Sequence, residues 1–417
     1  MLLFTAALVC VDCHRDVVER YALTAMANTS GQVRASRETP GKVGLYTITP
    51  DLRLVWAAGQ VQLSFFIGSR RMGRSFAFEY QKGLYQAPVG YYANRRVWDM
   101  APGYEHDTSP DLSRPIMTDC LFCHANRAML EPDTLNRYRE IVTGIQCVRC
   151  HGASTDHSAL VNPRKLSPRL RDSICEQCHL AGEVRLAQPG KKVEDFVPGD
   201  DLADFIEVFT SARKGVAVNG HADALARSRC KQKSGDRLWC GTCHNPHRPT
   251  ASYSAVCRNC HETPHNDSDC IACHMPKAKA YDGGHTAFTD HSISGDAAQG
   301  FTSYFRRQPS DRNLGLAYVR LASTRHDSNY LDRAWPFLRL AAANNWRDPE
   351  LYLEVANVLA AAGRKKLAIE YYRRTLGEDP LQPDALLKLA SLLEPSAEAH
   401  ELRGKASRIL PVPVWPK

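Results

Sequence analysis

The sequence lacks any apolar run long enough to cross a lipid bilayer. A membrane-spanning helix needs about 20 consecutive apolar residues, whereas the longest candidate is an N-terminal stretch of nine residues that ends just before Cys10. No basic region precedes this stretch and no cleavage site separates it from Cys10, so it is also incomplete as a signal peptide. We expect no transmembrane segment, and we expect the true start or the leader of the protein to lie upstream of Met1.

The chain also lacks the compositional bias of disordered and fibrous proteins. Charged residues make up 24% and apolar residues 43% of its 417 residues, and both values are close to the averages for globular domains. This length favours two or three domains over a single hydrophobic core.

Cysteine, by contrast, is abundant. Of fifteen cysteines, fourteen occur in seven C-x-x-C-H motifs, which we number 1 to 7 in chain order. The motif cysteines are Cys10 and Cys13, Cys120 and Cys123, Cys147 and Cys150, Cys175 and Cys178, Cys240 and Cys243, Cys257 and Cys260, and Cys270 and Cys273. The histidines that directly follow them are His14, His124, His151, His179, His244, His261 and His274.

This motif is the attachment site of c-type heme: the two thiols form thioether bonds to the heme, and the adjacent histidine binds its iron. Paired CxxC motifs also occur at zinc sites, but zinc does not require a histidine directly after every pair. The sequence therefore predicts seven covalently bound c-type hemes, with the motif histidines as proximal iron ligands.

The predicted hemes change the interpretation of the net charge. Protein groups alone give a formal charge of +8. Each ferric heme with two ionised propionates and two neutral histidines adds about −1, so seven hemes nearly cancel this excess. We therefore expect no nucleic-acid partner. Because c-type heme is attached outside the cytoplasm, we expect the protein to be exported, either periplasmic or extracellular.

The remaining histidines predict the second axial ligands. His326 and His400 lie in a C-terminal region without cysteine motifs. Seven others stand in or beside the motif region, and they are His106, His157, His221, His247, His265, His285 and His291. Seven free histidines for seven hemes predict bis-histidine ligation, which gives low-spin irons and low potentials suited to electron transfer.

The distal candidates differ in their local context. His247 and His265 follow their own proximal histidines so closely that each is expected to bind the iron of a neighbouring heme. His106, which stands in a loop flanked by Gly and Pro, is the first candidate for a histidine that does not bind iron. Met26 is an alternative ligand for the first heme, although methionine is more often a core residue. Cys230, the unpaired cysteine, is expected to be a buried free thiol, with a thiolate ligand or an intermolecular disulfide as alternatives.

The pattern between the motifs predicts the fold. Residues 30–110 carry no motif and alternate in short β-like runs between turns, which predicts an antiparallel β insertion. Residues 201–209 predict a short amphipathic helix within a long connection. We expect an α+β protein: a heptaheme domain over 1–300 with little regular secondary structure apart from this insertion, followed by an α-solenoid over 301–410.

The solenoid is predicted from a 34-residue register that starts at Gly315, Pro349 and Pro383. Its middle unit places a small residue at positions 8 and 20, which are Ala356 and Ala368. This spacing is typical of tetratricopeptide repeats, whose paired helices approach closely at the small residues. The repeats, together with the Pro-rich tail over 411–417, predict a docking surface for partner proteins, with a plain helical cap as the alternative.

Several stretches resemble a known family. GIQCVRCHG, DSICEQCHL, CGTCHNPH and CIACHMPK, with TDHSI and the repeats after them, resemble multiheme cytochromes of the doubled-CXXCH or cytochrome-c-554-like type with tetratricopeptide repeats. The resemblance covers most of the chain and implies extracytoplasmic electron transfer through the motif residues. No C-x-x-C-K motif occurs, which separates the sequence from pentaheme nitrite reductases.

These observations favour an electron conduit whose partners are redox proteins or other copies of the chain. In the second case the first and last hemes of adjacent subunits would meet in a filament. The alternative is a multiheme oxidoreductase that acts on a small nitrogen or sulfur species at one five-coordinate heme. That enzyme requires one of the seven free histidines not to bind iron.

Overall fold

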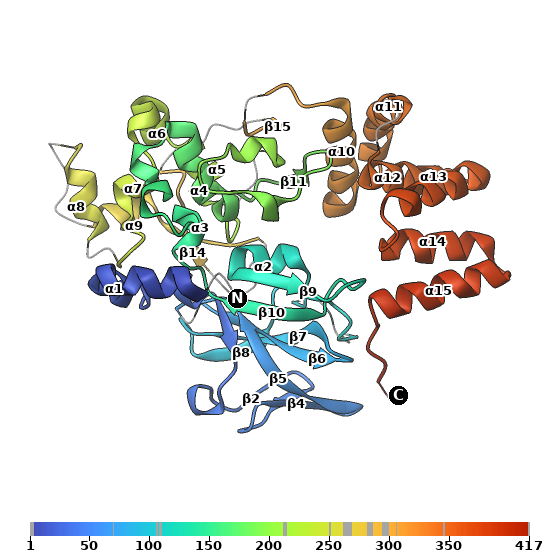
Figure 1. Ribbon diagram of the computed structural model, residues 1–417, viewed down its shortest axis with the longest axis horizontal. Coiled ribbons are helices and arrows are strands. Elements are labelled where there is room, and N and C mark those ends of the chain that lie inside the picture. The colour runs from blue at the N-terminus through green and yellow to red at the C-terminus, as the bar shows by residue number, and fades with distance from the viewer. Residues whose placement is uncertain are drawn as a thin grey trace.

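The computed structural model describes residues 4–69, 71–105, 107, 111–211, 215–249, 252–261, 269–281, 287–293, 300–305, 307–344 and 347–415. The chain forms three parts: a β-sheet, a motif region made of short helices, and a C-terminal stack of helices (Figure 1). The distal candidates His106, His265 and His285 lie outside the described residues.

The β insertion is an antiparallel sheet in which β2 to β8 pair in chain order and β1 pairs with β5. Its strands are β1 (Ser30–Gln32), β2 (Gly41–Val43), β3 (Tyr46–Ile48), β4 (Arg53–Trp56), β5 (Gly59–Ile67), β6 (Arg74–Tyr80), β7 (Gly83–Tyr92) and β8 (Val97–Met100).

Side chains alternate between the two faces of this sheet, as the pleat requires. On β6, Phe76 and Phe78 join one core with Tyr85, whereas Ala77 between them faces a second core with Leu84. Because both faces are covered, the sheet can present one side to the motif region and keep a hydrophobic core on the other.

The motif region is built from short helices and two-stranded or three-stranded pairings. Its helices are α1 (Phe4–Tyr21), α2 (Thr118–His124), α3 (Val148–His151), α4 (Pro168–His179), α5 (His221–Arg227), α6 (Arg229–Ser234), α7 (Cys240–Cys243), α8 (Tyr253–Arg258) and α9 (Cys270–His274). Its strands are β9 (Ala125–Leu130), β10 (Tyr138–Thr143), β11 (Val184–Ala187), β12 (Ile206–Thr210), β13 (Lys277–Lys279), β14 (Ala287–Thr289) and β15 (Thr302–Ser303).

The helix predicted over 201–209 is wrong. Leu202–Asp204 forms a single 3-10 turn and Ile206–Thr210 is β12, the central strand of a three-stranded sheet between β11 and β15. All five residues of β12 are buried. A strand that is covered on both faces has no polar side, so its sequence does not alternate and its short apolar run is easily taken for part of a helix.

The C-terminal helices form three antiparallel pairs, α10 (Asp311–Arg325) with α11 (Asn329–Ala343), α12 (Pro349–Ala361) with α13 (Lys365–Glu378), and α14 (Pro383–Leu393) with α15 (Ala397–Ile409). The predicted register is reproduced in its second and third units, since Pro349 and Pro383 are first helical residues, where proline fits, whereas Gly315 lies inside α10. A side chain on Gly315 would bring its Cβ within 2.8 Å of Leu338 Cδ2, so glycine permits the close approach of the first pair.

The core of the helical stack continues into the motif region. Val184 and Leu186 of β11 and Phe209 of β12 are buried in the same cluster as Leu316 and Leu338 of the stack. β15, just before the stack, pairs with β12. The hydrophobic core therefore crosses residue 301, and the boundary between the two predicted domains remains a prediction.

The C-terminal tail returns to the β-sheet. The Trp415 ring lies 5.0 Å from that of Trp56 and 5.8 Å from that of Tyr80, and the Tyr85 hydroxyl donates a hydrogen bond to the Pro411 carbonyl. Figure 1 shows the tail running from α15 towards the sheet. The tail that we expected to dock partners is thus used in an intramolecular contact.

The α+β class is confirmed, with 44% helix and 20% strand. Regular secondary structure in the motif region is short but more frequent than we expected. No helix among the described residues is long and apolar enough to cross a membrane.

Candidate heme sites

Each of the seven motifs lies on, or at the end of, a short helix. Motifs 1 to 5 lie on α1, α2, α3, α4 and α7, motif 6 extends from the end of α8, and motif 7 forms α9. One helical turn places residues i, i+3 and i+4 on the same side. The two cysteines and the histidine of a motif can therefore face one porphyrin edge. At motif 1 the backbone leaves the helical conformation at His14, where φ is −119° and ψ is 35°.

The fourteen motif cysteines are exposed or partly exposed as whole residues, and none is a fully buried residue. Among the described residues, no three His, Cys, Asp or Glu side chains gather as they would around one metal ion.

The motif histidines instead meet predicted distal histidines in pairs. The ring centroids are 6.1 Å apart for His14 and His157, 5.9 Å for His151 and His247, and 6.1 Å for His244 and His291. The ring planes in these pairs are inclined by only 23°, 11° and 24°. His157, His247 and His291 thus each lie beside the proximal histidine of one motif, with nearly parallel rings.

These separations fit two imidazoles that bind one iron from opposite sides. Metal bonds to imidazole nitrogen measure about 2.0–2.1 Å, and the nitrogen lies about 1.1 Å from its ring centre, so two coaxial rings are about 6.3 Å apart. The residues present therefore fit bis-histidine heme at motifs 1, 3 and 5.

The fourth pair is tighter. The rings of His179 and His221 are 5.2 Å apart at 84°, and His221 also lies 4.7 Å from His291. A shared iron would need the first pair to open by about 1 Å. His179, His221, His291 and His244 thus form one continuous cluster at motifs 4 and 5.

Hydrogen bonds and desolvation prepare these rings to bind a metal. Nδ1 of His151 lies 2.8 Å from the Val161 carbonyl and Nδ1 of His291 lies 2.9 Å from the Thr289 carbonyl, which orients each ring and leaves Nε2 available. Desolvation and neighbouring histidines lower the pKa of His179 to about 4 and that of His221 to about 3. Both rings are therefore neutral at pH 7, which is the state that ligates iron.

Among the buried polar atoms of the described residues that have no hydrogen-bond partner are two histidine nitrogens, Nδ1 of His124 and Nδ1 of His221. A buried polar atom without a partner is costly unless another group satisfies or reorients it. This observation also fits an additional group at motifs 2 and 4.

Cysteines of different motifs contact one another. Hydrogen bonds join the thiols of Cys10 and Cys147, of Cys123 and Cys178, and of Cys175 and Cys240. The helices that carry the motifs also pack together, since α2 contacts α4, α7 contacts α8, and α8 contacts α9. Each motif therefore has at least one other motif beside it.

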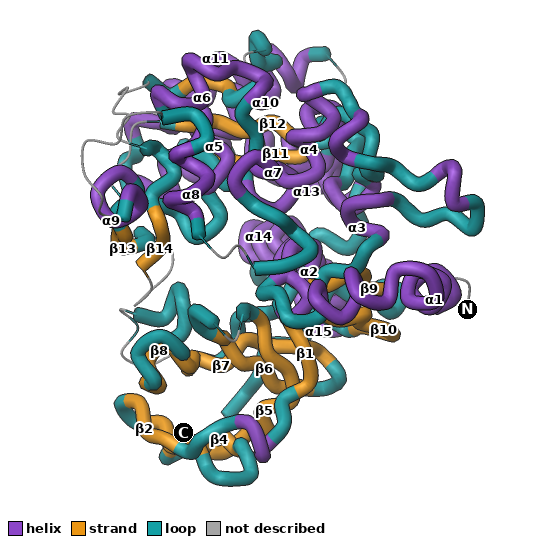
Figure 2. The backbone as a smooth tube through the Cα atoms, turned by 90° about the vertical axis from the view of Figure 1, so that its left-hand side faces the viewer, coloured by secondary structure: helices purple, strands orange, loops and turns teal. Residues whose placement is uncertain are grey.

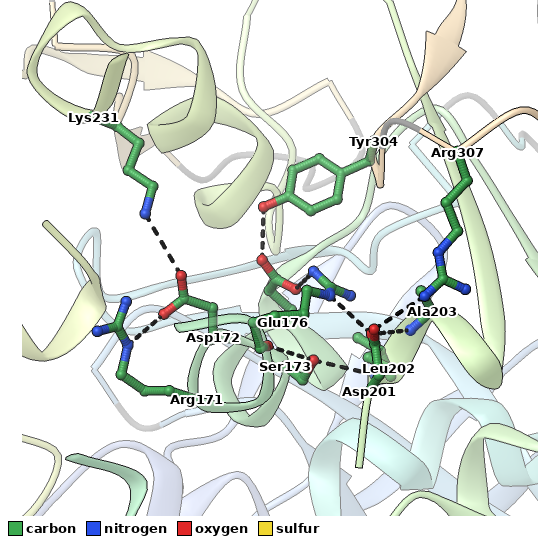
Figure 3. Close-up of polar contacts among 11 residues, drawn as sticks. Arg171, Asp172, Ser173, Glu176, Asp201, Leu202, Ala203, Lys231, Tyr304 and Arg307 are labelled. Atoms are coloured by element: carbon green, nitrogen blue, oxygen red, sulfur yellow. Dashed lines mark hydrogen bonds and ion pairs between the residues drawn. The ribbon is translucent and has the colours of Figure 1, made fainter. Parts of the chain in front are cut away.

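A buried polar network fixes motif 4 (Figure 3). Glu176, between the two cysteines of this motif, accepts hydrogen bonds from the Tyr304 hydroxyl at 2.7 Å and from Arg169 at 3.0 Å. Arg169 also donates to Asp201 at 2.8 Å, and Asp201 accepts from Arg307 at 3.1 Å. Burial raises the pKa of Glu176. The network joins α4 to the segment after β15, so it holds one motif against the start of the helical stack.

Sequence reasoning missed this network because the position of Glu176 in the motif carries no fixed residue type and the network joins segments that are far apart in the sequence. The sequence also offered Met26 as an alternative ligand for the first heme. Met26 is partly buried, and its backbone carbonyl accepts a hydrogen bond from the Ile145 amide. His14 has His157 opposite it instead. Burial raises the pKa of the Cys230 thiol, and this cysteine interacts with Cys260 of motif 6.

The comparisons with known proteins agree with two parts of the chain. Residues 99–152, which contain motifs 2 and 3, match the family model of cytochrome c554 and c-prime, and residues 349–392 match that of the tetratricopeptide repeat. No curated protein matches. A solved structure, the outer cell wall cytochrome OcwA, is similar at 15% identity and a TM-score of 0.44, covering 97% of this chain and 99% of that chain.

The resemblance drawn from the sequence is confirmed at these two segments. The cytochrome segment supports covalent c-type heme. The chain is thus similar to cytochrome c554 and c-prime over residues 99–152 and to the tetratricopeptide repeat over residues 349–392.

Proposed function

We propose that the protein transfers electrons through seven c-type hemes, one at each C-x-x-C-H motif. The proposal is carried by one observation: proximal and distal histidines lie opposite each other at the separation of two axial ligands, in a region where neighbouring motifs touch. Each heme iron, when bound, supplies reversible one-electron exchange. The chain itself holds the hemes and orients their ligands.

The pairs support a ligand assignment. We assign His157 to motif 1, His247 to motif 3, His221 to motif 4 and His291 to motif 5. Motifs 2, 6 and 7 then remain for His106, His265 and His285. His247 would thus bind the iron of another motif than its own, which ties separate chain segments into one cluster.

The chain has three tasks in this function. The thiols hold the cofactors, the hydrogen-bonded imidazoles orient their ligating nitrogens, and the polar network around Glu176 keeps motif 4 fixed. A second ligand on every iron leaves no open coordination position for a substrate. Fixed ligands also keep structural change small when the oxidation state changes.

The test is a count of hemes and of spin states in the purified protein. Intact mass should equal that of the chain plus seven hemes, and low-temperature EPR of the oxidised protein should show low-spin iron only. A high-spin signal from one heme in seven would instead support the alternative, an oxidoreductase that binds a small nitrogen or sulfur species at that heme.

We further propose that the protein works outside the cytoplasm and passes electrons to redox proteins or to copies of itself. α1 and α9, which carry motifs 1 and 7, lie on opposite sides of the motif region (Figure 2). Their cysteines Cys13 and Cys273 are exposed. End-to-end contact in a filament would bring such motifs together. Electron microscopy that shows only monomers at high concentration would contradict the filament.

A further inference from the structure

Motifs 2, 3 and 4 share one hydrogen-bonded contact point. Arg149 of motif 3 donates a hydrogen bond to the Phe122 carbonyl in motif 2 at 3.0 Å and another to Oε1 of Gln177 in motif 4 at 2.9 Å. Gln177 donates back to the Arg149 carbonyl at 3.2 Å. The Arg149 guanidinium also lies 4.2 Å from the centre of the Phe122 ring. We call these three residues the junction.

Thiol contacts at the junction lead to the same three motifs. Cys178 of motif 4 interacts both with Cys123 of motif 2, by a hydrogen bond, and with Cys150 of motif 3. Gln177 is only 4% exposed, so the junction is enclosed. Because one guanidinium nitrogen of Arg149 donates to acceptors on two motifs, the arginine fixes how motifs 2 and 4 lie relative to motif 3.

Among the described residues, the contacts of motif 1 lead to motif 3. Cys10 is hydrogen-bonded to Cys147 of motif 3. The hydroxyl of Tyr21, at the end of α1, donates to the Ile145 carbonyl just before motif 3 at 2.7 Å. The order in space therefore departs from the order in the sequence, where motif 2 stands between motifs 1 and 3.

On its other side the junction leads to motifs 5, 6 and 7. Cys175 of motif 4 is hydrogen-bonded to Cys240 of motif 5, and the ring of His221 stands between those of His179 and His291. The helix of motif 5, α7, packs against α8, from whose end motif 6 extends, and α8 packs against α9 of motif 7. These contacts extend the series to α9.

Motif 2 contacts the β-sheet on the side away from the junction. Leu121 and Ala125, each 1% exposed, are buried against Phe65 and Leu84 of the sheet. The hydroxyl of Ser30, on β1, donates to the His124 carbonyl at 2.6 Å. Motif 2 is thus held between the junction and the β insertion.

We propose that the electron path branches at the junction. Its main line runs through motifs 1, 3, 4, 5, 6 and 7 in that order, and motif 2 forms a separate branch that ends at the β insertion. Electrons can then enter or leave at three ends, so the protein can serve a third redox partner beside the two at the ends of the line. The inference rests on the proposed function.

The first test locates the seven irons in the intact holoprotein by anomalous diffraction. The iron of motif 1 should have that of motif 3 as its nearest neighbour, and the iron of motif 2 should be nearest to that of motif 3 or 4. An iron of motif 2 that lies between those of motifs 1 and 3 would overturn the branch. This measurement needs no variant and does not depend on electron transfer.

The second test follows electrons from one end. In a Cys230→Ser background, a photoreductant attached at Glu19→Cys, an exposed position of α1, feeds electrons into the chain near motif 1 under continuous illumination with a sacrificial donor. Absorbance reports the fraction of hemes reduced in the fast phase. Without motif 2 (Cys120→Ala/Cys123→Ala) all six remaining hemes should be reduced. Without motif 4 (Cys175→Ala/Cys178→Ala) the three hemes of motifs 5, 6 and 7 should stay oxidised.

A path in sequence order predicts the opposite result. Loss of motif 2 would then leave the five hemes of motifs 3 to 7 oxidised, and this outcome overturns the branch. Failure of the proposed function would look different, because electrons would not spread beyond the first heme even with all seven motifs intact. If a deletion variant does not fold, the iron positions still decide the order.

Discussion

Replacement of His247 tests whether a histidine of one motif's segment binds the iron of another. His247 stands three residues after His244 of motif 5, but its ring lies 5.9 Å from that of His151 in motif 3, inclined by 11°. Two axial imidazoles are expected about 6.3 Å apart. We therefore expect His247→Ala to remove the sixth ligand of the motif 3 heme and of no other.

The expected magnitude is one iron in seven. A five-coordinate or water-bound ferric heme is high-spin, so quantitative EPR of the oxidised variant should show one-seventh of the iron in the high-spin state and the rest low-spin. His157→Ala should produce the same fraction at motif 1, and the double variant should show two-sevenths, because the two pairs do not share a ring. His326→Ala, in the helical stack, is the control and should leave all seven hemes low-spin.

A second background identifies the heme. When motif 3 is removed by Cys147→Ala/Cys150→Ala, His247→Ala should no longer add a high-spin signal. If the signal persists there but disappears in a chain without motif 5, His247 binds its own heme and the assignment is refuted. Unchanged low-spin spectra of His247→Ala would refute it as well. His247→Met should keep the iron six-coordinate and raise the potential of one heme, since methionine ligation raises heme potentials.

Three further predictions concern stability. Trp415→Ala should lower the free energy of unfolding by about 2 kcal/mol in urea titrations, because the ring packs on Trp56 and Tyr80. The control is Val414→Ala, at a position 76% exposed, which should change this free energy by less than about 0.5 kcal/mol. Equal effects would show that the tail does not hold the sheet. Arg312→Met should cost about 3–5 kcal/mol, since its partner Asp348 is 4% exposed and would be left buried without a cation. The exposed Arg320→Met should cost less than about 1 kcal/mol. We expect the hemes to supply much of the apolar core around the motifs. In chain prepared without heme, hydrogen exchange should therefore leave residues 311–409 protected and the motif helices unprotected, and protected motif helices would contradict this expectation.

The β insertion and the helical stack could be predicted from the sequence because each has a local pattern. Short apolar and aromatic runs such as Phe76, Ala77 and Phe78, bounded by turn residues, mark the strands, and the placement of Pro349 and Pro383 marks helix starts. β12 was not predicted from the sequence. Its residues are buried on all sides between β11 and β15, and only the partners that cover them decide that the segment is a strand.

The seven motifs and their proximal histidines follow from the sequence alone, because the geometry of heme attachment is local and fits within one helical turn. The number of distal candidates follows from it too. Which distal histidine faces which motif does not, since the two rings come from segments far apart in the chain and meet only when tertiary packing closes around them. The same holds for the junction: Phe122, Arg149 and Gln177 occupy variable motif positions, and only their three-dimensional contact gives them a role. Local geometry thus fixes the sites, and packing fixes their order.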